Sequence, residues 1–208
     1  ETALSFYPLN IGDYWEYRDD SWNYSIPPFY YDSSFYSVEV IGDTIHTNNL
    51  KYKILVRRKI PYDNNSYYFF ERIDSSTANV YRYCALSTLK NNEYLLDSLL
   101  AKENDVSKST RDESYFNIRK TVCLCIDAVS VLGEETVVKC FQDQSFIPGF
   151  NYKIAKGFGY IGDLNCEFGC GSTTLLYAII NGIEYGEKIT SVESNDNVYI
   201  NGFRLFQN

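Results

Sequence analysis

Hydrophobic and polar positions alternate along this chain over short runs that turn residues separate. The clearest case is 122–141, where β-branched and aromatic residues lead into and out of Leu132-Gly133. Such residues suit a pleated, half-buried surface, so the pattern predicts two antiparallel strands joined by a two-residue turn. In that register Cys125 lies opposite Cys140, close enough for a disulfide, and Cys123 shares the face of Cys125.

Similar short strands are expected along most of the chain, bounded by Asn, Asp, Gly or Ser. The predicted strands are 14–17, 36–41, 50–60, 67–73, 80–84, 173–180 and 183–185, the last two joined at Asn181-Gly182. This spacing is typical of an antiparallel meander, and the absence of strand–helix alternation excludes a parallel sheet. The predicted fold class is all-β, an antiparallel meander forming a sandwich or a curved half-barrel that disulfides staple.

Several segments give a less regular pattern. Pro27-Pro28 makes 19–35 a loop or an edge, because tandem proline is incompatible with a central strand. Residues 91–101 fit a helical stripe and a strand face equally. The glycine-rich run 157–172 lacks the context of a phosphate loop and predicts tight turns and bulges. In the first strand, Trp15 should face the core, with Tyr14 and Glu16 on the other side.

The 208 residues are enough for one domain with a substantial core. We expect a single antiparallel domain over 1–187, with its one candidate seam in the charged stretch 102–113. A polar linker is expected at 188–198, followed by a C-terminal strand at 199–208.

The six cysteines indicate an oxidised, exported protein. Zinc is the weaker interpretation, because no C-x-x-C spacing or nearby histidine accompanies them. Beside Cys125–Cys140, proximity predicts Cys166–Cys170, which leaves Cys84 to pair with Cys123.

The formal net charge of −8 argues against nucleic acid and against an anionic membrane surface as partners. No apolar run is long enough to cross a bilayer, so membrane insertion is not expected. The chain opens at Glu1 without a charged leader and apolar run, which we interpret as a mature extracellular or cell-surface product after signal-peptide removal.

The sequence predicts no catalytic residue, no metal site and no cofactor. His46 is the single histidine, placed in an exposed turn without a G-x-S-x-G motif elsewhere. Glycoside hydrolysis needs two convergent carboxylates, and no pair stands out among the 27 acidic residues. We therefore expect a protein that is not an enzyme.

Both ends of the chain resemble cargo proteins of the type IX secretion system. The closing phrase Phe203-Arg-Leu-Phe-Gln-Asn208, preceded by Thr190-Ser-Val-Glu193 and a polar linker, resembles the join to their C-terminal sorting domain. The opening 6–17 and the runs 155–160 and 176–186 are similar to secreted β domains of such cargo. The resemblance implies passage through the periplasm and outer membrane and removal of a sorting domain near residue 208. Asp-[Ser/Thr]-apolar triplets at Thr44 and Ser98 resemble O-glycosylation sites of such bacteria.

Two functional hypotheses follow. The first is a self-assembling subunit of a surface fibre or layer, a homopolymer joined by exchange of the terminal strand that contains Tyr199, Ile200, Phe203, Leu205 and Phe206. The alternative is an adhesin or carbohydrate-binding module for surface glycans. It would use the aromatic cluster 15–36, with Trp15, Trp22, Tyr30 and Tyr31 as candidate stacking rings. Packing of these rings in the core, or addition of both chain ends to their own sheet, is the plainer interpretation of each pattern.

Overall fold

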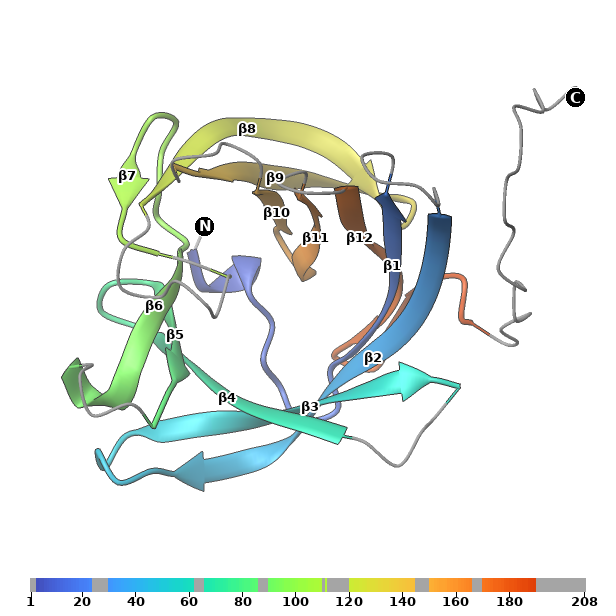
Figure 1. Ribbon diagram of the computed structural model, residues 1–208. Helices are drawn as coiled ribbons and strands as arrows, with labels where there is room; N and C mark the ends of the chain where they lie inside the picture. The colour runs from blue at the N-terminus through green and yellow to red at the C-terminus, as the bar shows by residue number, and fades with distance from the viewer. Residues whose placement is uncertain are drawn as a thin grey trace, which may run out of the picture.

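One antiparallel sheet takes up every strand in the described part of the chain (Figure 1). The computed structural model describes residues 3–23, 30–61, 66–85, 90–109, 111, 120–144, 150–165 and 170–189. The strands are β1 (Tyr14–Asn23), β2 (Tyr30–Ile45), β3 (Lys51–Ile60), β4 (Ser66–Asp74), β5 (Asn79–Tyr83), β6 (Glu93–Ser98), β7 (Val106–Ser107), β8 (Thr121–Val131), β9 (Glu134–Asp143), β10 (Asn151–Ala155), β11 (Gly159–Asn165), β12 (Cys170–Ile180) and β13 (Ile183–Gly186). Two 3₁₀ turns, η1 (Ala3–Phe6) and η2 (Lys90–Asn92), complete the described elements.

The strands follow one another round a ring in chain order. β1 to β6 form one meander and β7 to β12 form a second, and β1 pairs with β12 to join the two. The right-handed twist of paired strands accumulates across so many of them, and the sheet curls into a barrel-like wall (Figure 1). The predicted antiparallel meander is confirmed, in the form of one curved sheet.

The ring has one interruption, between β6 and β7. There the connection Leu99–Asp105 is tied to the second meander by main-chain hydrogen bonds, Asn104 N to Cys123 O at 2.7 Å and Cys123 N to Asp105 O at 3.0 Å. The buried Lys139 of β9 adds two more, because its Nζ donates to the carbonyls of Leu99 at 2.6 Å and Ala101 at 2.7 Å. Polar contacts therefore hold the seam that strand pairing leaves open.

The N-terminal segment lies inside the ring of strands, where Figure 1 shows η1 surrounded by the sheet. Tyr7 and Leu9 are buried there, and Gly157 N donates to Ser5 O at 2.7 Å. The apolar residues that open the chain therefore fill the interior of the fold.

Alternation along each strand divides the residues between the interior and the outer surface. On β1, Trp15 and Tyr17 are in the core, and the Trp15 Nε1 donates to Phe158 O at 2.8 Å. Glu16 points to the other side, as predicted, but it is buried as well. Its carboxylate accepts hydrogen bonds from the Tyr14 hydroxyl and from Ile189 N, each at 2.7 Å, which satisfy it there.

The central hairpin folds about Leu132-Gly133 as predicted, and Cys125 is bonded to Cys140. The prediction that Cys123 shares a face with Cys125 is wrong. A bulge at Leu124 places Cys123 opposite the buried Phe141 and Cys125 opposite the half-exposed Cys140, so the two residues face opposite sides.

The predicted pairing of Cys84 with Cys123 is also wrong, since both are free thiols. Cys84 follows β5 and Cys123 lies on β8, and the strand order places β6 and β7 between these strands. Cys170 is in a disulfide, and its predicted partner Cys166 lies outside the described residues.

Three irregular segments prove to belong to the sheet. The segment 19–35 contributes the end of β1 and the start of β2, where Asp20 accepts from the Tyr31 hydroxyl at 2.7 Å, while Pro27-Pro28 is outside the described residues. The ambiguous 91–101 forms β6. The glycine-rich run contributes β11, with a bulge at Ile161 beside Gly162, and the predicted bulge is confirmed.

The assembly strand 199–208, with Tyr199, Ile200, Phe203, Leu205 and Phe206, and most of the linker 188–198 lie outside the described residues, as do positions 110, 112 and 113 of the 102–113 stretch. Among the described residues, no helix is long and apolar enough to cross a membrane.

Candidate ligand-binding cavity

A cavity of about 860 Å³ lies within the curved sheet. Inward-facing residues of β1 to β5, β11 and β12 line it, together with Tyr7, Pro8, Leu9, Arg111 and Phe150. At one end the lining side chains reach solvent, and Tyr67 there is 72% exposed. A space of this size is typical of sites that hold small organic ligands.

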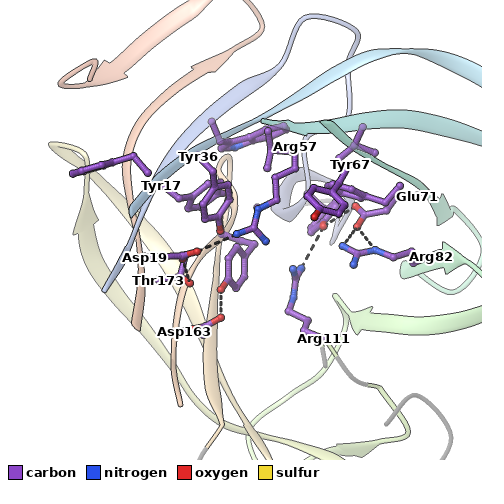
Figure 2. Close-up of a pocket in the computed structure, with 18 of the residues that line it drawn as sticks. Tyr17, Asp19, Tyr36, Arg57, Tyr67, Glu71, Arg82, Arg111, Asp163 and Thr173 are labelled. Atoms are coloured by element: carbon purple, nitrogen blue, oxygen red, sulfur yellow. Dashed lines mark hydrogen bonds and ion pairs between the residues drawn. The ribbon is translucent and has the colours of Figure 1, made fainter. Parts of the chain in front are cut away.

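At the open end, Arg57 of β3 lies flat on Tyr36, with the guanidinium carbon 3.6 Å from the ring centroid (Figure 2). Tyr36 in turn stacks on Tyr17, with the ring centroids 5.1 Å apart. The Arg57 Nη2 donates to Asp19 at 3.0 Å, and Asp19 also accepts from the Thr173 hydroxyl at 2.7 Å. Cation–π contact and ion pairing therefore hold the guanidinium in one orientation.

The inner end holds a buried network of charges. Glu71 accepts two hydrogen bonds from Arg82, at 2.7 and 3.1 Å, and one from the Tyr7 hydroxyl at 2.8 Å. Arg111 pairs with the buried Asp97 through two nitrogens and donates to the Tyr7 hydroxyl at 3.3 Å. Figure 2 shows Arg111 beside Glu71 and Arg82 at this end of the cavity. Burial, together with the nearby Glu71, raises the pKa of the Tyr7 hydroxyl well above its usual range, so Tyr7 stays protonated as a donor.

Asp163 lies on the β11 side of the cavity and accepts a hydrogen bond from the Tyr160 hydroxyl. Burial raises the pKa of Asp163, and the neighbouring Asp19 raises it further. Both oxygens of the nearby Asp19 already accept hydrogen bonds, one from Arg57 and one from the Thr173 hydroxyl.

The sequence-predicted sugar-binding rings divide between two sides of the sheet. Trp15 is 5% exposed and contributes to the cavity wall, so it offers no ring at the outer surface. Trp22 and Tyr31 pair across β1 and β2, and Tyr31 is 50% exposed. The side chain of Tyr30 is outside the described part of the structure. The proposed cluster of four rings is therefore not one surface.

His46 lies in the turn after β2, away from the cavity. The prediction that this histidine is exposed is wrong, because ring contacts leave it half-buried. Its ring stacks on Tyr83 with the centroids 3.9 Å apart and meets Phe70 edge-on at 4.4 Å. Burial lowers its pKa, and no hydroxyl nucleophile is bonded to it in the described residues.

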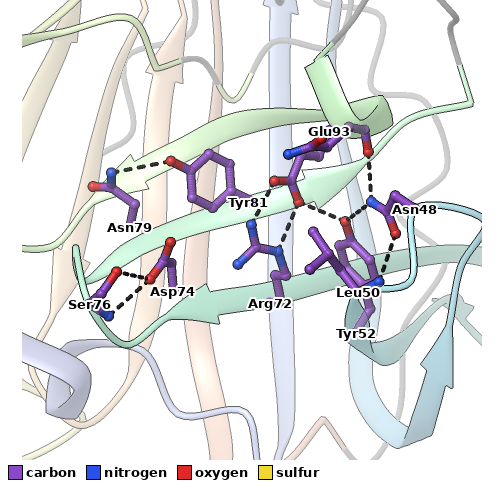
Figure 3. Close-up of polar contacts among 10 residues, drawn as sticks. Asn48, Leu50, Tyr52, Arg72, Asp74, Ser76, Asn79, Tyr81 and Glu93 are labelled. Atoms are coloured by element: carbon purple, nitrogen blue, oxygen red, sulfur yellow. Dashed lines mark hydrogen bonds and ion pairs between the residues drawn. The ribbon is translucent and has the colours of Figure 1, made fainter.

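A polar network beside this turn has a structural role (Figure 3). Glu93 accepts from Arg72 at 2.6 and 2.9 Å and from the Tyr52 hydroxyl at 2.6 Å. Asn48 donates to Tyr52 at 2.7 Å and to Asn91 O at 2.6 Å. These bonds tie β3, β4 and β6 together and leave the Glu93 carboxylate fully paired.

The remaining predicted sites lie elsewhere on the sheet. Thr44 on β2 and Ser98 at the end of β6 are half-buried, and their O-glycosylation stays a prediction. The one group of metal-type ligands that lie close together among the described residues is Cys125, Asp127 and Cys140. Its two sulfurs are bonded to each other, so it is a disulfide and not a metal site.

Sequence reasoning missed the charged lining of the cavity. A signal for it exists in β3, where Leu55 is buried and Arg57 and Lys59 follow at two-residue intervals on the same face. The same interval joins Glu71 to Phe69 on β4. Charged residues in an inward-facing row indicate either ion pairs buried in the core or a polar cavity. Here they form both.

Comparison with known proteins identifies no family. No protein-family model matches the chain, and no curated protein matches it. Among solved structures, a Bacteroides fragilis protein described as exported, with a YmcC-like fold, aligns with a TM-score of 0.46 and 8% identity over 82% of this chain and 96% of that one. A lipoprotein from Parabacteroides distasonis aligns with a TM-score of 0.32 and 10% identity over 82% of this chain and 96% of that one. Likeness at this level carries no argument about function.

Proposed function

We propose that this protein is a non-enzymatic, exported binding protein that holds a small organic ligand in the cavity of its curved sheet. The observation that carries the proposal is the cavity itself, about 860 Å³ in volume and lined by tyrosine rings beside charged groups of fixed orientation. Rings supply contact area and the polar groups supply orientation, which is the usual division of labour in ligand pockets.

Export is supported by the cysteine chemistry. Cys125–Cys140 is a disulfide and Cys170 is in another, and such bonds persist in oxidising compartments. The resemblance of the chain ends to type IX cargo supports that route, with a location outside the cell or on its surface.

The self-assembly hypothesis depends on residues 199–208, outside the described part of the chain, and stays a prediction. The N-terminal segment gives it no support, because this segment is buried within its own fold.

A ligand screen with a blocked variant tests the binding proposal. Thermal shifts are measured with sugars, sugar acids and aromatic acids on the wild-type protein and on Ser34→Trp, which narrows the cavity from its lining. Ile45→Trp is the matched control, since Ile45 lies on the same strand at an outer position that is 69% exposed. We expect a stabilising ligand whose effect falls with Ser34→Trp and persists with Ile45→Trp. A ligand that stabilises both variants equally would place binding outside the cavity and end the proposal.

A further inference from the structure

The acceptors that line the cavity are already engaged. Both oxygens of Asp19 accept hydrogen bonds, and so do both oxygens of Glu71. Asp163 accepts from Tyr160. A ligand that offered only donors would therefore compete with bonds that the protein makes to itself.

Donors at the open end of the cavity are in surplus. Lys59 lines the cavity and makes no hydrogen bond or ion pair with any described residue. Arg57 uses one nitrogen, Nη2, to bond a described residue. Arg57 and Lys59 are two residues apart on one face of β3, roughly 7 Å along the strand, so one anionic group can reach both.

Neighbouring strands add two hydroxyls to this end. Tyr67 of β4 pairs directly with Arg57, and Ser34 of β2 lines the cavity near Lys59, whose own partner is Tyr36. Neither hydroxyl bonds a described side chain. The residues at the opening thus combine two cations and two neutral donors, within a protein whose net charge is −8. Asp19 balances the charge of Arg57, whereas Lys59 has no ion-pair partner among the described residues, so its positive charge favours an anion at this end of the cavity.

We propose, building on the binding function above, that the ligand is an organic anion with a ring-shaped body, an acidic sugar being the simplest class. Its carboxylate, sulfate or phosphate is bound by Arg57 and Lys59. Its body lies deeper, against the rings of Phe69 and Tyr160, which also line the cavity. Cation–π contact with Tyr36 holds the Arg57 guanidinium in place before the ligand arrives.

The test compares a neutral sugar with its acidic counterparts. Trp22→Phe leaves Trp15, in the cavity wall, as the single tryptophan, so its fluorescence reports occupancy. Glucose, glucuronate, glucose 6-sulfate and glucose 6-phosphate are titrated in this background and, by calorimetry, into the wild-type protein. The two charged esters distinguish a sulfated from a phosphorylated source.

Lys59→Gln is the informative variant, because Lys59 has no partner among the described residues whose loss would weaken the fold. Lys51→Gln is the control, as it removes the same charge from the same strand at a residue that pairs with Asp43. We expect an acidic probe to bind at least about tenfold more tightly than glucose, and Lys59→Gln to remove about tenfold of that affinity, the effect of one charge-assisted hydrogen bond. Lys51→Gln should leave it unchanged, and added salt should weaken the acidic probe alone.

Three outcomes overturn the inference. Equal affinity for glucose and the acidic probes shows that the protein does not recognise the negative charge of the ligand, although the cavity remains a binding site. Equal effects of Lys59→Gln and Lys51→Gln show that the anion binds elsewhere. Absence of saturable binding by every acidic probe removes the proposed ligand class. Failure of the cavity itself appears separately, as binding that Ser34→Trp does not affect.

Discussion

We expect Lys139 to stabilise the folded protein at the seam between β6 and β7. Lys139 bridges it with two hydrogen bonds to main-chain carbonyls, and the described strands show no pairing of β6 with β7. Lys139→Met keeps most of the side-chain volume and leaves both carbonyls without their donor. Each orphaned carbonyl costs about 1–3 kcal/mol, and relief from burying an ammonium offsets part of this. We expect a net loss of about 3 kcal/mol, which for a protein of this size lowers the Tm by roughly 6–12 °C.

Urea unfolding followed by tryptophan fluorescence measures this loss, with Lys153→Met on the exposed face of β10 as the control.

The pH dependence of the free energy of unfolding is a second test of the role of Lys139. Burial lowers the pKa of Lys139, so the folded state releases this proton before the unfolded state does. The wild-type protein should therefore gain stability relative to Lys139→Met as the pH rises toward the ordinary lysine pKa of about 10.4. A loss below about 0.5 kcal/mol, or a difference in stability between the two proteins that narrows with rising pH, would show that Lys139 does not stabilise the fold in this way.

Three further predictions concern the disulfide, a bulge and a buried acid. Reducing or replacing Cys125–Cys140, which closes a loop of 15 residues, should cost about 3 kcal/mol in urea unfolding. Gly162→Ala should cost about 2–4 kcal/mol, because its Cβ would lie 2.2 Å from Thr173 O at a φ of +147°. Asp163→Asn should stabilise the protein near pH 7: burial raises the pKa of Asp163, so wild-type stability falls as the pH rises above about 4, and the gain should vanish in acid.

Each of these three predictions has a matched control variant and a result that would contradict it. Cys84→Ser, at a free thiol, should be nearly neutral, and an equal loss at both sites would argue that the disulfide contributes nothing specific. Gly157→Ala has a φ of +86° without a steric neighbour, so parity with Gly162→Ala would attribute the cost to backbone strain alone. Asp127→Asn is at an exposed position on β8, and a gain there equal to that of Asp163→Asn would contradict burial as the cause.

Local pattern predicted the strands and hairpins well. The turn at Leu132-Gly133 and the pairing of Cys125 with Cys140 depend on neighbours in sequence, and both are confirmed. That Cys123 and Cys125 face opposite sides of the sheet was not predictable. The bulge at Leu124 depends on how β8 pairs with β9, and no glycine or proline in the sequence marks it.

Closure of the sheet and its cavity depend on long-range pairing that alternation does not encode. The pairing of β1 with β12 decides that the meanders close on one another. Once they do, the N-terminal segment carrying Tyr7 is inside, and the inward row of Arg57 and Lys59 becomes a cavity wall. On an open sheet the same residues would form a face exposed to solvent. Their place in a cavity wall therefore depends on closure of the sheet and could not be predicted from their spacing.

A crystal structure of the protein with glucuronate, the simplest acidic-sugar probe, would locate the bound anion. We expect ligand density inside the sheet, with its anionic group bonded to Arg57 and Lys59 and its ring beside Tyr160. Ligand density on the outer face, at Trp22 and Tyr31, with the cavity holding water alone, would contradict it.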